Sequence, residues 1–93
     1  MDKIIAELIQ FRVDRGWGDH HIEPELSRAL MIEAGELNEL YLWNQYPQTD
    51  RLAEEVADVM IYAMYLCEKR GLDPETIIRE KMVKNAVKYP ALE

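Results

Sequence analysis

This chain of 93 residues has little cysteine, no long apolar run and no excess of basic residues. Cys67 is the only cysteine, which excludes an intrachain disulfide and a zinc site built on cysteines. No stretch approaches the roughly 18–20 apolar residues of a membrane span, and the residues from Met1 to Ile5 do not resemble a secretory segment. We therefore expect a cytoplasmic protein that has no membrane as partner.

Acidic residues outnumber basic ones, and the formal net charge is −7 at pH 7. Affinity for DNA or RNA comes largely from Lys and Arg at phosphates, so this balance argues against a nucleic-acid polymer as partner. The acidic charge remains compatible with the binding of a single nucleotide through a metal ion. Residues 1–93 are predicted to form one small domain, and because so short a chain buries a modest core, we expect oligomerisation to add stability.

Apolar periodicity predicts four helices and no strand. Gly16 and Gly18 end the first helix, Pro24 opens the second, and Gly71 stops the third. The expected helices cover residues 2–14, 24 to 43 or 44, 51–70 and 74–87. Short connections favour antiparallel neighbours, so the prediction is an all-α four-helix bundle.

The ends and faces of these helices carry further predictions. Thr49 or Asp50 is expected to cap the third helix, and Asp73 is expected to cap the fourth. The third helix is also apolar on its reverse side, at Ala57, Ile61 and Met64. A helix that is apolar nearly all round is buried on both sides, so the second side is predicted to pack across a subunit interface.

Two pairs of carboxylates indicate a metal site. Glu33 and Glu36 form one pair, Glu55 and Asp58 the other, and i, i+3 spacing puts both members of a pair on one side of a helix. Glu33 falls inside the apolar stripe of its helix, where an acid is costly unless it is paired or metal-bound. Four carboxylates on two packed helices repel one another unless a hard cation lies between them, and oxygen ligands favour Mg²⁺ or Mn²⁺.

Two other interpretations of these acids were weighed. For Glu39 and Glu54 a solvated helix face is the preferred interpretation. Between residues 33 and 58, however, seven acids accompany a single base, Arg51, so ion pairs within the helices cannot neutralise the cluster. A carboxylate-bridged di-iron site is disfavoured because it needs Glu-x-x-His pairs, and the two histidines, His20 and His21, precede the second helix.

The predicted fourth helix is basic on one face, which carries Lys81, Lys84, Asn85 and Lys88. Lys81 and Asn85 are candidates for binding phosphate oxygens beside the metal, whereas a solvated face explains the other two lysines equally well. Trp17 and Trp43 offer stacking surfaces for a base, although partly buried packing is the commoner role of tryptophan.

Three motifs in fixed order carry a family resemblance. The first covers residues 30–43 and contains E-A-G-E-L-N-E-L, the second covers residues 54–62, and the third is K-x-x-x-N-x-x-x-Y-P at residues 81–90. Together they resemble the MazG-like all-α nucleoside triphosphate pyrophosphohydrolases over about residues 11–90. The G-E-L-x-E-L-x-x-W and K-Y-P elements are most similar to the dCTP pyrophosphatase branch.

The resemblance implies hydrolysis of a nucleoside triphosphate to the monophosphate and pyrophosphate, as house-cleaning of non-canonical or pyrimidine deoxynucleotides. It implies Mg²⁺ bound by Glu33, Glu36, Glu55 and Asp58, with Glu36 as the candidate general base. It also implies phosphate or sugar contacts from Lys81, Asn85 and Tyr89, and base contacts from Trp17, His21 and Trp43. A homodimer or homotetramer with sites between subunits is expected.

Two alternatives stay open at this point. A non-catalytic helical interaction module would carry the same acids on its surface without binding Mg²⁺. A related all-α hydrolase would act instead on dUTP or dUDP, or on phosphoribosyl-ATP.

Overall fold

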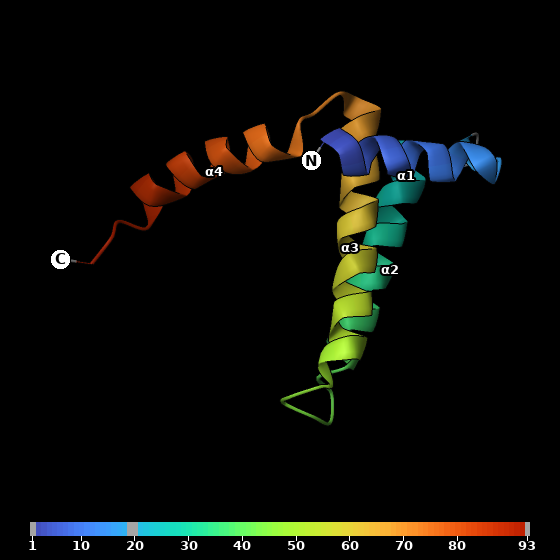
Figure 1. The fold of residues 1–93 in the computed structure, drawn as a ribbon. Helices are drawn as coiled ribbons and strands as arrows, with labels where there is room; N and C mark the ends of the chain where they lie inside the picture. The colour runs from blue at the N-terminus through green and yellow to red at the C-terminus, as the bar shows by residue number, and fades with distance from the viewer. Residues whose placement is uncertain (1, 19–20, 93) are drawn as a thin grey trace.

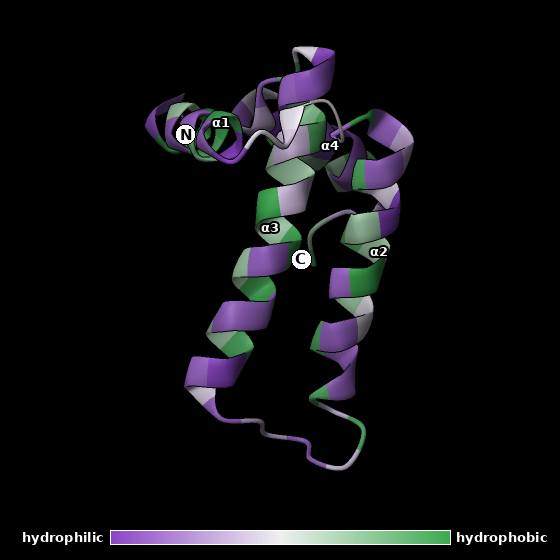
Figure 2. Ribbon diagram, turned by 90° about the vertical axis from the view of Figure 1, so that its right-hand side faces the viewer, coloured by the Kyte–Doolittle hydropathy of each residue, from purple (hydrophilic) through white to green (hydrophobic). Residues whose placement is uncertain are grey.

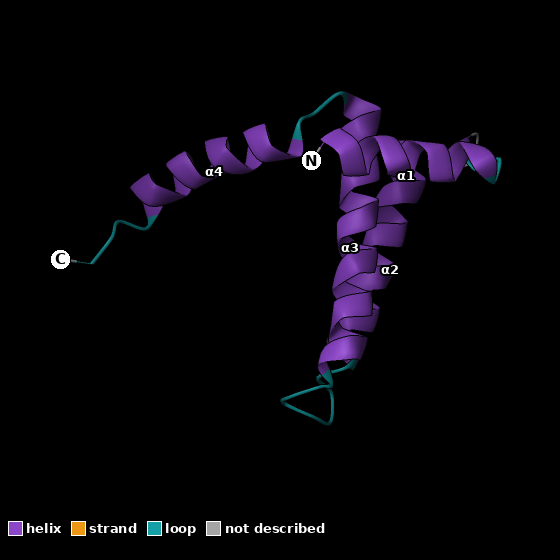
Figure 3. Ribbon diagram, in the orientation of Figure 1, coloured by secondary structure: helices purple, strands orange, loops and turns teal. Residues whose placement is uncertain are grey.

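The computed structural model describes residues 2–18 and 21–92. Within them the chain forms helices and connections and no strand, as the all-α prediction requires (Figure 3). The helices are α1 (Asp2–Asp14), α2 (Glu23–Glu39), α3 (Thr49–Arg70) and α4 (Pro74–Lys88). The first and last of these agree with the predicted ranges to within one residue.

The two long helices α2 and α3 lie side by side and form an antiparallel hairpin, as Figures 1 and 2 both show. Helix α1 crosses this hairpin near the C-terminal end of α3, and α4 projects away from the other three (Figure 1). The predicted four-helix bundle therefore does not close within one chain. The reason is the turn after α3, which directs α4 outward instead of back along the hairpin.

Helix α2 ends at Glu39, several residues before the predicted Trp43 or Asn44. Its last turn tightens, because the N–H groups of the three residues after Glu39 donate to carbonyls three residues back, at 3.0–3.2 Å. Trp43 therefore lies beyond the helix, and it is 96% exposed. The backbone then turns at Asn44, whose Oδ1 accepts the Tyr46 N–H at 2.9 Å.

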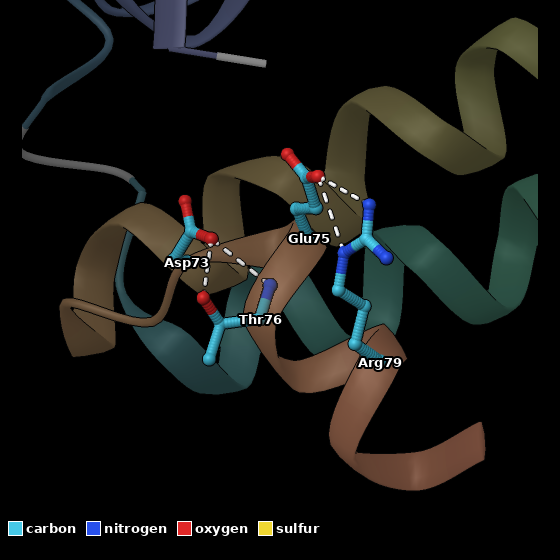
Figure 4. A network of polar contacts seen from close by, with 4 residues as sticks. All are labelled: Asp73, Glu75, Thr76 and Arg79. Carbon is cyan, nitrogen blue, oxygen red and sulfur yellow. Dashed lines mark hydrogen bonds and ion pairs between the residues drawn. The ribbon is translucent and has the colours of Figure 1, made fainter. Parts of the chain in front are cut away.

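The ends of α3 and the start of α4 test three further predictions. Neither Thr49 nor Asp50 caps α3, because both lie within the helix and Gln48 takes the cap position in extended backbone. Gly71 ends α3 as predicted, in the left-handed conformation with φ 64°. Asp73 caps α4 as predicted, since its carboxylate accepts the N–H and the hydroxyl of Thr76 at 2.9 and 2.7 Å (Figure 4).

The junction of α1 with α3 holds two of the buried residues, Arg12 and Tyr65. Among the described residues, Leu26 is 1% exposed, Tyr65 3% and Arg12 6%. Arg12 donates to Glu68 at 2.8 Å, and the Tyr65 hydroxyl donates to the Leu8 carbonyl at 2.9 Å. Burial of an arginine is tolerated because Glu68 supplies the opposite charge. These contacts attach α1 to α3.

A large part of the apolar surface stays exposed in the single chain. The accessible surface is 7626 Å², whereas a compact chain of 10.9 kDa exposes about 5,600 Å². The most exposed large apolar side chains of α2, α3 and α4 include Met31 (70%), Met60 (52%), Val83 (69%) and Val87 (81%). On the reverse side of α3, Ala57 is exposed, while Ile61 and Met64 are partly buried.

Among residues 2–18 and 21–92, no helix has the length and apolar content that crossing a membrane requires. The cytoplasmic location and the single-domain organisation stay predictions.

Candidate functional site

The two pairs of carboxylates meet where α2 and α3 pack against each other. Glu33, Glu55 and Asp58 each place a carboxylate oxygen within 4.8 Å of the others, a grouping that can hold a metal ion. Glu36 lies beside them, since its charge acts on both Glu33 and Glu55. The predicted convergence of acids from two helices is therefore present, because i, i+3 spacing aligns each pair and the hairpin faces them together.

The environment of these carboxylates disfavours several negative charges at once. Burial, the adjacent Glu36 carboxyl and the charges of Asp58 and Glu55 raise the pKa of Glu33 from 4.5 to about 7. Burial, Glu36 and Asp58 also raise the pKa of Glu55, and Arg51 opposes this shift. Positive charge at this cluster would therefore stabilise the ionised carboxylates.

Two of the carboxylate oxygens are also short of hydrogen bonds. Glu33 Oε2 and Glu55 Oε2 are buried and have no hydrogen-bond partner among the described residues. A buried acceptor without a partner costs free energy that a bound cation recovers. The donor set consists of carboxylate oxygens alone, which suits a hard divalent cation. The residues present thus fit a metal of this kind.

A cavity of about 640 Å³ adjoins the acids at the end of the hairpin where α2 connects to α3. Side chains of α2, of the connection and of α3 line it, namely Glu36, Glu39, Leu40, Trp43, Asn44, Pro47, Gln48, Arg51 and Glu55. Glu36 and Glu55 belong both to the acid cluster and to the cavity wall. A ligand in this cavity therefore contacts the candidate metal site directly.

Several residues of the cavity wall were not predicted from the sequence. Glu39 is predicted to lie on a solvated helix face. It is exposed, and its side chain lines the cavity. Asn44 and Gln48 come from the connection, whose path no periodicity describes. The sequence pattern identifies Arg51 only as the sole base among the acids, although its i, i+4 spacing to Glu55 puts both residues on one side of α3.

The aromatic residues predicted to contact a base lie at two different ends of the hairpin. The Trp17 ring is 6.0 Å from that of His21, and the His21 ring is 4.8 Å from that of Tyr65, beside α1. Phe11 extends this group, with its ring centroid 5.8 Å from that of Trp17. Trp43 lines the cavity at the opposite end. One chain does not bring the three predicted base-contacting residues together.

The predicted phosphate-binding residues also lie apart from the acids. Lys81 and Asn85 are exposed on α4, and Tyr89 follows it with 67% of its side chain exposed. Because α4 projects away from the hairpin, these three residues do not reach the acid cluster of their own chain (Figure 1). Their predicted roles require a second copy or a different position of α4.

Comparison with known proteins identifies the family. The family model described as MazG-like matches residues 26–93, which include all four clustered acids. The chain therefore belongs to the MazG-like family, as the resemblance predicted.

Individual relatives extend the comparison. The chain is 33% identical to dCTP pyrophosphatase 1 of Mus musculus over 91 residues, an alignment that covers 87% of this chain and 54% of the mouse protein. It is also 33% identical over 92 residues to dCTP pyrophosphatase 1 of Homo sapiens, covering 88% of this chain and 54% of the human protein. The chain thus spans about half the length of the curated relatives it matches.

A solved structure resembles the whole fold. The crystal structure of a pyrophosphatase from Archaeoglobus fulgidus matches with a TM-score of 0.86 at 32% sequence identity. The match covers 98% of this chain and 93% of the archaeal chain. The projecting α4 therefore belongs to an arrangement of helices that a related protein also adopts.

Proposed function

We propose that this protein is a Mg²⁺-dependent nucleoside triphosphate pyrophosphohydrolase, which converts a (d)NTP and water to the (d)NMP and pyrophosphate. The observation that carries the proposal is the cluster of Glu33, Glu55 and Asp58, in which two buried carboxylate oxygens have no partner among the described residues and Glu55 also lines a cavity. The names of the relatives, dCTP pyrophosphatase 1 and a pyrophosphatase, support the same reaction. House-cleaning of non-canonical or pyrimidine deoxynucleotides is the role we propose for it.

In this proposal the four acids bind the metal, with Mn²⁺ as an alternative to Mg²⁺. When bound, the ion would supply positive charge to the phosphates and lower the pKa of a water molecule. Glu36 lies on the cavity wall beside the cluster, so its carboxylate is the group we assign to orient the attacking water and accept its proton. Trp43, also on the wall and highly exposed, would stack on the base.

We further propose that the protein is a homodimer or homotetramer whose sites combine residues of two copies. The single chain exposes roughly 2,000 Å² more than a compact chain of its mass, while a standard interface buries about 800 Å² per partner. Lys81, Asn85 and Tyr89 on α4 of a second copy would then reach the phosphates, and Trp17 and His21 would complete the base site. Sedimentation velocity at several protein concentrations tests this, and a monomer at all of them would contradict it.

The reaction is tested by pyrophosphate release from normal and modified nucleoside triphosphates, with Mg²⁺ and with EDTA. We expect metal-dependent release that Glu36→Gln abolishes and that the control Glu54→Gln retains, because Glu54 is exposed and does not line the cavity. Including dUTP, dUDP and phosphoribosyl-ATP separates the related hydrolases. A folded protein that releases pyrophosphate from no nucleotide would favour the non-catalytic interaction module instead.

A further inference from the structure

Arg51 has an unusual position on the cavity wall. It lies in the first turn of α3, one turn before Glu55, and both side chains line the cavity that Glu36 enters from α2. The wall contains three acids, and Arg51 is its single basic residue. A positive side chain is thus held beside the candidate metal site without being part of it.

Arg51 also forms no close ion pair in the described part of the chain, although its charge acts on Glu55. Glu54 and Glu55 follow at i, i+3 and i, i+4, the spacings at which helical ion pairs form. Nevertheless, within residues 2–18 and 21–92, no carboxylate lies within 4.0 Å of its guanidinium, although Arg12, Arg28, Arg70 and Arg79 all form such pairs. The Arg51 side chain is exposed to the cavity and retains its hydrogen-bond donors for a ligand.

We propose that Arg51 is a substrate-binding residue that donates to the phosphate chain of the bound nucleotide, an inference that rests on the proposed function. The guanidinium presents a planar fork of donors that matches two phosphoryl oxygens, and it is charged at all physiological pH values. Metal ions neutralise only part of a triphosphate, and the oxygens that face away from the acids need other donors. In one chain Arg51 fills that role, because the lysines of α4 lie elsewhere.

A purely electrostatic role is the competing explanation, in which Arg51 only reduces repulsion among Glu36, Glu55 and Asp58. The two explanations differ in what a change of side chain does. Arg51→Lys keeps the charge and loses the fork, whereas Arg51→Gln loses the charge and keeps two donors. A direct contact with phosphate requires both the charge and the fork of donors, so both variants should then bind phosphate more weakly. If Arg51 only reduces repulsion among the acids, Arg51→Lys should bind phosphate as the wild type does.

The test is isothermal titration of the full chain with inorganic pyrophosphate and, separately, with deoxycytidine monophosphate, both in the presence of Mg²⁺. We expect the Kd for at least one probe to rise about tenfold in Arg51→Gln and severalfold in Arg51→Lys, as loss of a charge-assisted hydrogen bond predicts. Weaker pyrophosphate binding locates Arg51 at the leaving group, and weaker monophosphate binding locates it at the retained phosphate. Arg28→Gln is the matched control, because it removes an exposed arginine of α2 that does not line the cavity.

The outcome distinguishes this inference from the proposed function. If the wild-type protein hydrolyses nucleotides but Arg51→Gln binds both probes with unchanged Kd, the inference is overturned and the function stands. If Arg51→Lys binds both probes as wild type does, the neutralising explanation replaces it. If the wild-type protein binds the probes in an Arg51-dependent manner but hydrolyses no nucleotide, the contact is supported and the function fails. Absence of binding of either probe to the wild-type protein overturns the inference.

Discussion

Replacing Glu33 by Gln tests the acid cluster through stability as well as metal binding. Burial, and after it the neighbouring carboxyls, raise the pKa of Glu33 from 4.5 to about 7. In the unfolded chain the same carboxyl ionises near its ordinary value. The folded metal-free protein therefore loses stability as the pH rises from about 4.5 to 7, because the folded state holds the proton more tightly than the unfolded state does.

The magnitude follows from the same shift. One pKa unit corresponds to about 1.4 kcal/mol, so a change from 4.5 to about 7 corresponds to roughly 3 kcal/mol before solvent screening. Screening at a partly exposed carboxyl reduces this, and we expect Glu33→Gln to stabilise the metal-free protein by about 1–2 kcal/mol at pH 8. At pH 4.5 and below the two proteins should differ little, because Glu33 is then protonated and as neutral as glutamine.

The assay is urea unfolding at one fixed protein concentration, at pH 4.5 and pH 8, in EDTA and then in Mg²⁺. A bound ion stabilises the native state by roughly 2.7 kcal/mol at a hundred times its Kd, so Mg²⁺ should stabilise the wild type and have much less effect on Glu33→Gln. Glu54→Gln provides the control for loss of one negative charge. The reasoning is refuted if Glu33→Gln has the same effect at both pH values, or if Mg²⁺ stabilises it as much as the wild type.

Four further predictions concern the crossing of α1 and α3, the end of α3 and the cavity. Arg12→Gln should lower the free energy of unfolding in urea by about 2–3 kcal/mol. The loss is smaller than for a fully buried ion pair because Glu68 is partly exposed. If the effects of Arg12→Gln and Glu68→Gln add up in the double variant, the two residues are not paired. The Arg12 hydrogen bond lowers the pKa of Glu68, so the stability from this pair is present above pH 4.5 and lost as the pH falls through the lower folded value. Gly71→Ala should destabilise by about 1 kcal/mol at its φ of 64°, and an unchanged unfolding midpoint would argue against that backbone conformation. Trp43→Ala should leave the melting temperature unchanged while raising KM for nucleotide, and an unchanged KM would remove Trp43 from the base site.

Local features of the chain were predicted well from the sequence. Gly71 and Asp73 end one helix and begin the next as expected, because left-handed backbone and side-chain capping depend on single residues and their neighbours. The alignment of Glu33 with Glu36, and of Glu55 with Asp58, follows from the geometry of a helix turn. The end of α2 was predicted too late, because the apolar pattern continues to Trp43 although the helix ends at Glu39 and Trp43 is highly exposed.

Contacts between distant residues required the tertiary structure. Arg12 is buried because α1 crosses α3 at Glu68, and periodicity along α1 alone does not distinguish it from Phe11 as the inner residue. Arg51 borders a cavity only because the connection after α2 brings Trp43 back beside it. Likewise, the direction of α4 separates Lys81 and Asn85 from the acids of their own chain.

The sequence by itself thus determined that the chain is helical, that Gly71 ends α3 and Asp73 caps α4, and which acids share a side of a helix. These features depend on residues within one or two turns. Only the tertiary structure decided which sides face one another, that Trp17 and Trp43 lie at opposite ends, and that much apolar surface stays uncovered. These properties depend on the paths of the connections and on packing between segments far apart in the chain, which no local pattern encodes.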